Sequence, residues 1–368
     1  MEGAIALKKS NIDIKRANLN YLGLNKFIGM YLIIRMHLYD NKHMPFNFGI
    51  RMCELLFVSS GFLVGYNNYN KQIEYNFISS IKYAYKHLRS FYPYYIINLF
   101  YGLYLNKNKI KFNITSIELL LINIFLIANW SSHRRIARFY FGISWFLDNI
   151  FYCYIISIFL LSSINNIKNS LKLFILVTLS RILSEKFLQL GAYNVFNTNF
   201  HCGPIIRILE FYMGMLMIPL FFRFKIIFDK FHKYFTFQII VTIIQILLPL
   251  FLYYIMVEYK AKLLRCYFVL IFCIYIFIIG FDYGYLSKFT SQKIFKIIIS
   301  TQLEMYLIQF NVHYTFDKYF GENRIGKLYR LFTYYMEVII IFTIAYFYRK
   351  FFRDKFAKLM DKIILLFI

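Results

Sequence analysis

The chain has 368 residues, of which 60% are hydrophobic, 22% are aromatic and only 17% are charged. Soluble globular domains carry about a quarter charged residues, so this composition excludes an ordinary soluble fold. The formal net charge of +25 would suggest nucleic acid in a soluble protein. Here Lys and Arg are spread over the connections between apolar runs, which membrane orientation and anionic lipid explain. We therefore expect membrane lipids, and no nucleic acid, as partners.

Eleven apolar runs follow one another along the chain. A helix needs about 20 residues to cross roughly 30 Å of hydrocarbon, so they predict an all-α, polytopic membrane helical bundle. The weakest of the eleven are those at 115 and 171. The runs are 21–39, 47–66, 90–105, 115–130, 141–163, 171–185, 204–222, 235–257, 263–281, 294–314 and 330–348.

The positive-inside rule gives the expected orientation. The basic segment Lys71 to Arg89 is expected inside, whereas the stretch from Phe187 to Pro204 has no Lys or Arg and is expected outside. Eleven crossings would break this pattern, so we expect about 10 transmembrane helices plus one re-entrant or interfacial segment. The expected units are a basic cytoplasmic N-terminal tail (1–20), one transmembrane domain (21–348) and a basic C-terminal tail (349–368) in the cell (inner) membrane.

The first apolar run carries three side chains that hydrocarbon disfavours: Lys26, Arg35 and His37. Charge in a membrane costs about 2.5 kcal/mol or more and usually marks a pathway or a partner. At 100° and ~1.5 Å per residue, Lys26 and His37 lie on nearly one helix face, ~16 Å apart, while Arg35 points elsewhere. The alternatives are that Lys26 snorkels to the headgroups and that His37 is a packing residue.

The five cysteines do not suggest a disulfide framework. Four of them fall within apolar runs, where a thiol packs as a small hydrophobe. No Gly-rich phosphate loop or zinc signature is present, so we expect no metal and no bound cofactor. The cysteines are Cys53, Cys153, Cys202, Cys266 and Cys273.

Several separated motifs occur in a distinctive order. Lys26 precedes His37 by eleven positions, Glu54 precedes Ser60-Gly61-Phe62 by six, and a basic stretch with Lys86 and Arg89 leads into Phe91-Tyr92-Pro93. Later come Ser144-Trp145-Phe146-Leu147 with Tyr154, Arg207 to Gly214, and Ser300 to Leu307. This series resembles the acyltransferase 3 family of integral membrane acyltransferases over nearly the whole chain.

The resemblance implies an enzyme that moves an acyl group, most simply acetyl, from cytosolic acyl-CoA (acetyl-CoA) to a hydroxyl of a cell-surface or lipid-linked polysaccharide. One departure stands out, because Lys26 holds the place of the family's arginine. Lysine binds an anion as a point charge and lacks the planar, bidentate fork of arginine.

Acyl transfer needs a base for the hydroxyl proton. His37 is the expected catalytic base, and Glu54 is the candidate carboxylate behind it; the alternative for Glu54 is a packing hydrogen bond elsewhere in the bundle. Lys26, Lys86 and Arg89 are expected to bind the anionic donor, with membrane anchoring as the alternative for the last two.

Four further residues are expected to support the site. Ser60 and Gly61 allow close helix approach, and Trp145 and Asp148 line the cavity. Arg207, Glu210 and Glu304 are expected to form ion pairs within the bundle. A transporter or flippase of lipid-linked glycans is the alternative function, although it has no evident need of the ordered motifs.

Overall fold

The structure is a computed structural model that describes residues 19–38, 47–71, 76–105, 114–130, 144–189, 203–258, 267–320 and 327–365. Every regular element in these ranges is helical, which confirms the predicted all-α class. The expected N-terminal tail lies outside the described residues up to position 18.

The helices follow the predicted apolar runs closely, because each of the eleven runs overlaps a helix. The first half contains α1 (Asn20–Leu38), α2 (Asn47–Asn68), α3 (Phe77–Leu88), α4 (Tyr92–Leu105), α5 (Ile114–Ile124), a 3₁₀ turn (Ala128–Trp130), α7 (Ser144–Leu160), a 3₁₀ segment (Leu161–Asn165) and α8 (Ile167–Gln189). The second half contains α10 (Pro204–Leu216), α11 (Ile218–Phe228), α12 (Phe235–Glu258), α13 (Phe268–Ile279), α14 (Tyr285–Thr290), α15 (Lys293–Ser300), α16 (Gln302–Phe320), α17 (Lys327–Phe347), a π-helical turn (Tyr348–Phe352) and α18 (Arg353–Leu365).

Three helical stretches of the described chain are long and apolar enough to cross a membrane: Ser144–Asn165, Pro204–Phe228 and Phe235–Met256. Two further apolar helices, α5 and α13, are shorter. At ~1.5 Å per residue the 11 residues of α5 span roughly 16 Å, about half of the hydrocarbon thickness. Of the two weakest runs, α5 is therefore the short one, because α8 has 23 residues.

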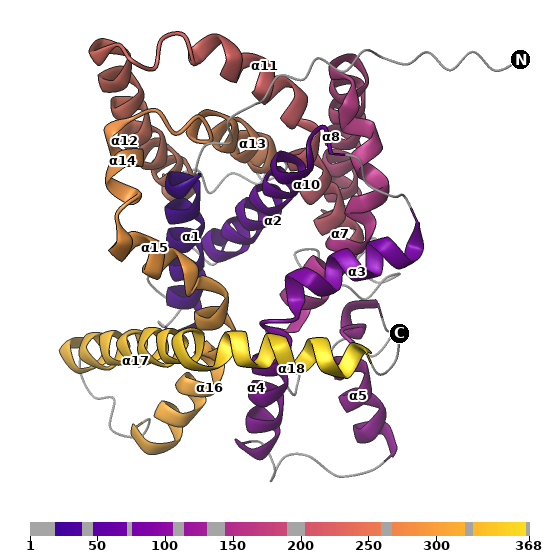
Figure 1. The fold of residues 1–368 in the computed structure, drawn as a ribbon. Helices are drawn as coiled ribbons and strands as arrows, with labels where there is room; N and C mark the ends of the chain where they lie inside the picture. Colours follow the sequence, from indigo (N-terminus) through magenta and orange to yellow (C-terminus); the bar gives the residue numbers. More distant parts are fainter. Residues whose placement is uncertain are drawn as a thin grey trace, which may run out of the picture.

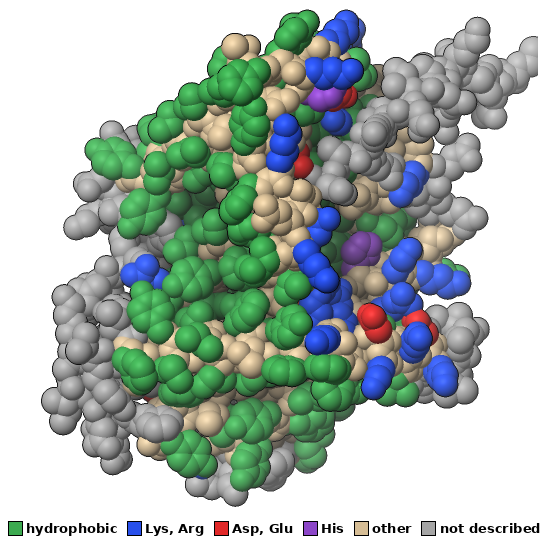
Figure 2. Space-filling model, turned by 60° about the vertical axis from the view of Figure 1, so that its left-hand side comes forward, with side chains coloured by type: hydrophobic (Ala, Val, Ile, Leu, Met, Phe, Trp, Pro, Cys, Tyr) green, Lys and Arg blue, Asp and Glu red, His purple; other side chains and the backbone are tan. Residues whose placement is uncertain are grey.

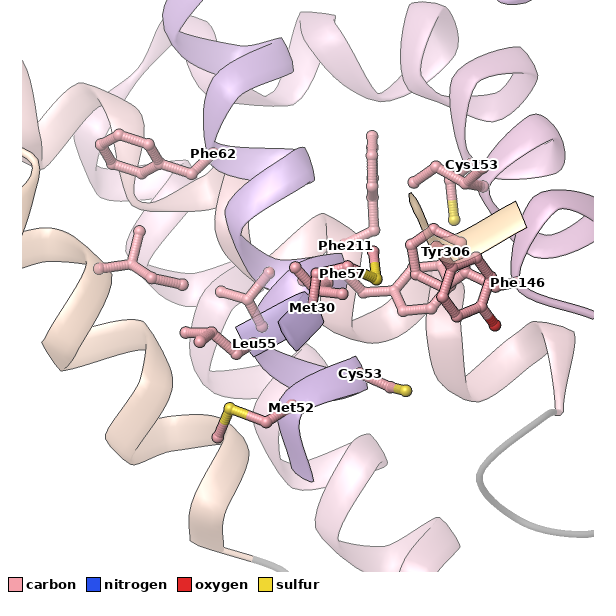
Figure 3. Close-up of a cluster of buried hydrophobic side chains, with 14 of the residues drawn as sticks. Met30, Met52, Cys53, Leu55, Phe57, Phe62, Phe146, Cys153, Phe211 and Tyr306 are labelled. Carbon is pink, nitrogen blue, oxygen red and sulfur yellow. The ribbon is translucent and has the colours of Figure 1, made fainter. Parts of the chain in front are cut away.

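The core is built around α2, which packs between α1, α10 and α13 (Figure 1). Phe57, Phe62, Phe211 and Tyr306 from α2, α10 and α16 are completely buried. Phe57, Phe211 and Tyr306 lie near Met30 of α1, whereas Phe62 lies apart from them at the upper left of the view (Figure 3). One face of the molecule is largely apolar, whereas Lys and Arg side chains gather along its right-hand side (Figure 2).

Helices α2 and α10 approach each other unusually closely. A Cβ atom on Gly61 would lie 1.7 Å from the backbone oxygen of Phe211, and one on Gly214 would lie 2.0 Å from that of Val58. Only glycine fits at such contacts, as in other close helix pairs. The position of Gly61 thus agrees with the packing role expected for a small residue there.

Two segments that the charge pattern assigns to the same side of the membrane meet in the structure. Arg89, just after α3, forms an ion pair with Asp361 of α18, and the Tyr85 hydroxyl donates to the same carboxylate at 3.3 Å. The Tyr348 hydroxyl also donates to the backbone oxygen of Ser90 at 3.0 Å. The predicted C-terminal tail is therefore helical up to residue 365, and its α18 contacts Tyr85 of α3.

Substituting Gly61 by alanine is expected to destabilise the protein by about 1–3 kcal/mol or more, because α2 and α10 must separate to admit the methyl group. Gly29→Ala is the matched control, since its Cβ would meet Leu55 at an ordinary 3.5 Å. Thermal unfolding in detergent measures both variants. Equal unfolding midpoints for the two would contradict the close contact.

Candidate functional site

A cavity of about 320 Å³ lies between α1, α2, α3, α7 and the start of α16. Its polar wall includes Lys26, Ser60, His87, Arg349 and Arg353, and its apolar wall includes Met30, Leu56, Phe91, Phe146 and Tyr154. The Lys26 ammonium donates to the Ser60 hydroxyl at 3.3 Å. Three cationic side chains from opposite ends of the sequence therefore meet around one space.

The turn between α17 and α18 brings in two of these cations. Arg349 lies in the π-helical turn, a rare element that is frequent at functional sites, and Arg353 follows four residues later on the same side. A nitrogen of each guanidinium lies 3.6 Å from Oε1 of the buried Glu304, so Glu304 has the expected ion-pair contacts. Lys26 is the third cation at the cavity, so the three positive side chains outnumber the single Glu304 carboxylate beside them.

His87 of α3 closes the cavity on another side. Its Nδ1 lies 3.0 Å from the backbone oxygen of Tyr83 and therefore donates, and its ring stacks on Tyr154 at 4.5 Å. Burial lowers the pKa of His87 below its ordinary value of 6.5. The histidine is thus uncharged at neutral pH and adds a polar but neutral surface.

His37 lies farther along the face of α1 that carries Lys26 and Met30. Its Nδ1 lies 3.0 Å from Oε1 of Gln309 in α16, and its ring stacks on Phe310 with centroids 4.8 Å apart. Met30 lines the cavity and precedes His37 by seven residues, roughly 10 Å of helix. His37 is therefore not part of the cavity wall, which ends on α1 at Met30.

A network of six buried charges joins α2, α8 and α10. Arg181 donates from Nε to Glu210 at 2.9 Å and from Nη1 to Glu185 at 2.8 Å, and its Nη2 lies 3.3 Å from Glu54. Arg51 pairs with Glu54 and Glu185. Arg207 and Glu210, which were both expected to form ion pairs in the bundle, pair with each other. Three arginines thus balance three glutamates.

Glu54 belongs to this network, and the structure does not bring it to His37. Within the described residues its contacts are to Arg51 and Arg181, while Nδ1 of His37 contacts Gln309. Glu54 shares a helix face with Val58 and Gly61, four and seven residues on, and this face packs on α10. Neighbouring α1 instead packs on the face with Leu55, so antiparallel packing of α1 and α2 is insufficient to form the dyad.

The remaining expected site residues lie outside the cavity wall. Lys86 is exposed, and Arg89 pairs with Asp361. The Trp145 ring lies 5.8 Å from the Arg207 guanidinium, and the Asp148 carboxylate accepts from the backbone of Asn129 at 3.3 Å. Trp145 and Asp148 thus contact the surrounding framework, one at the charge network and the other at the 3₁₀ turn.

No site role was predicted from the sequence for Arg349, Arg353, His87 or Gln309. A signal was available for the two arginines, because their spacing of four places them on one side of a helix. Gln309 and Phe310 gave no such signal, since only the packing of α16 against α1 brings them to His37.

In the described ranges, no group of three or more His, Cys, Asp or Glu side chains is arranged to hold a metal ion. The cationic cavity instead has the chemistry to hold an anionic group.

Comparison with known protein families, curated protein sequences and solved structures finds no match to this chain.

Replacing Arg181 by methionine is expected to destabilise the protein by about 3–5 kcal/mol, because three buried carboxylates would then share two arginines. Arg89→Met is the matched control: its side chain and that of Asp361 are 38% and 36% exposed, so it should cost about 1 kcal/mol or less. Unfolding by detergent titration measures both. A small effect at Arg181 would contradict the role of the network.

Proposed function

We propose that the protein is a membrane-bound O-acyltransferase that transfers an acyl group, in the simplest case acetyl, from cytosolic acyl-CoA to a hydroxyl of a cell-surface or lipid-linked polysaccharide. The observation that carries the proposal is the cavity in which Lys26, Arg349 and Arg353 meet. The ordered motifs from Lys26 through Glu54 to Pro93 resemble those of acyltransferase 3 enzymes and agree with this use of the cavity.

The chemistry of the cavity suits the donor. Coenzyme A carries several phosphate charges, and guanidinium and ammonium groups are the usual phosphate partners. Arg349 and Arg353 offer two planar guanidinium groups, which compensate for the lysine at position 26. The apolar side chains of Met30, Leu56 and Phe146 provide a wall for the uncharged arm that leads to the thioester.

The arrangement of charges supports a cytosolic donor. The segment Lys71 to Arg89 before α4 and the segment after α17 that begins at Arg349 are both basic, and the charge rule assigns both to the cytoplasmic side. The two segments contact each other beside the cavity. The proposed topology has about ten membrane crossings in the cell membrane, with both ends inside. In the described residues, the stretches long and apolar enough to cross are those in α7, α10 with α11, and α12.

In the proposed reaction Lys26 and the two arginines hold the donor at one end of α1, and His37 acts about 16 Å farther along the same face. His37 takes the proton of the sugar hydroxyl while the hydroxyl oxygen attacks the thioester carbonyl. The network around Glu54 keeps α2 in place beside α1. Glu54 therefore supports the site through the bundle rather than by contact with His37.

Binding of coenzyme A tests the donor site directly. Arg349→Met and Arg353→Met are each expected to weaken binding by roughly tenfold or more, because each removes a charge-assisted hydrogen bond. Arg223→Met, which changes an exposed arginine of α11, is the control. Calorimetric titration of the detergent-solubilised protein measures the affinities, and equal affinities for all three variants would contradict the site.

Glycan analysis tests the activity itself. A strain that lacks the protein is expected to lose an acyl mass from its surface polysaccharide. The wild type and a His232→Ala control should restore this mass, whereas His37→Ala should not, since general-base catalysis contributes roughly 10²-fold to 10⁴-fold. Mass spectrometry of the purified glycans is the measurement. Unchanged acylation in the deletion strain would instead favour transport of lipid-linked glycans.

A further inference from the structure

Gln309 of α16 is a buried amide whose orientation is fixed by a backbone contact. Its Nε2 donates to the backbone oxygen of Tyr306 at 3.0 Å, and a carbonyl oxygen can only accept a hydrogen bond. The amide oxygen of Gln309 must therefore face the other way, where it lies 3.0 Å from Nδ1 of His37. The side chain is 0% exposed, so bulk water does not compete for either contact.

This contact decides which nitrogen of His37 carries the proton. An amide oxygen is only an acceptor, so Nδ1 must donate, and Nε2 of the neutral ring then holds a lone pair. Phe310, the next residue of α16, stacks on the imidazole with 29° between the two planes. Within the described part of the chain, Nε2 of His37 has no hydrogen-bond partner. The ring is thus held in one tautomer and one plane.

We infer that Gln309 is a positioning residue that keeps Nε2 of His37 as the basic nitrogen for the acceptor's hydroxyl proton. The inference rests on the proposed acyl transfer. In that step the hydroxyl oxygen bonds to the thioester carbonyl carbon while its proton moves to Nε2. The carbon–sulfur bond then breaks, and Nε2 returns the proton to the leaving thiolate, which gives the ester and the free thiol.

Catalytic histidines usually have a carboxylate as the hydrogen-bond partner of their second ring nitrogen. A neutral amide in this position affects the charged form of the ring differently. A carboxylate would stabilise the imidazolium, whereas Gln309 orients the ring without adding charge. From α16, His313 acts on His37 electrostatically, and its own nitrogens lie 3.2 Å from Asp317 and 3.1 Å from Glu337 of α17. On α1 the nearest charged residue in sequence is Arg35. The carboxylates on this side are thus engaged with His313.

The tautomer can be measured in the resting, detergent-solubilised full chain with no donor present. Nitrogen NMR of ¹⁵N-histidine-labelled protein, assigned with His37→Asn, should show a proton on Nδ1 and none on Nε2 in the wild type. Gln309→Leu should give a mixture of tautomers. Gln245→Leu removes another buried amide, which donates to Ser287 at 2.8 Å, and should leave the His37 signals unchanged.

Kinetics separate positioning from a merely structural role. Gln309→Leu should lower kcat by roughly 10²-fold and change KM for the donor by less than about threefold. Gln309→Glu keeps an acceptor, so it should retain more activity than Gln309→Leu and move the optimum to higher pH, because the carboxylate stabilises the imidazolium.

A proton on Nε2 in the wild type would overturn the inference, as would a Gln309→Leu variant with unchanged tautomer and kcat. A wild-type protein that binds coenzyme A without transferring an acyl group would overturn the proposed function and the catalytic use of Nε2. The NMR result would still decide whether Gln309 fixes the ring, because that measurement needs no substrate.

Discussion

Three arginines and three glutamates lie buried where α2, α8 and α10 meet. Charges removed from water are tolerated only when each finds partners at close range, so these helices cannot slide past one another without leaving a charge unpaired. The glycine contact between α2 and α10 fixes the same junction by shape. Helix α1 packs on another face of α2, where Gly29 approaches Leu55 and Lys26 donates to Ser60.

Helix α1 carries two different environments along one face. At Lys26 it borders a cavity with three cations, and at His37 it meets a neutral amide and a stacked ring from α16. Binding of an anion and removal of a proton make opposite demands on local charge, since surplus positive charge disfavours an imidazolium. In the proposed reaction, a separation of three helical turns lets α1 serve both demands.

Much of the fold follows from local pattern. Every predicted apolar run overlaps a helix. The spacing of three residues places Arg207 and Glu210 within reach of each other on one helix. The pairing of Lys26 with Ser60 joins two residues that were both singled out beforehand. The predicted contact between the Glu54 carboxylate and the His37 ring is not formed, because it required the face of α2 that carries Glu54 to meet α1. The α10-facing side of α2 holds Glu54 instead.

Helix periodicity and the burial of apolar surface are local properties, so the helical class, the apolar runs and the shared face of Lys26 and His37 could be predicted from the sequence. Contacts between distant segments bring Arg349 and Arg353 to the cavity, Glu54 to α8 and α10, and Gln309 to His37, and these contacts could not be predicted from local pattern. Runs of similar apolar composition specify their neighbours weakly, so close packing and the pairing of buried charges decide which faces meet.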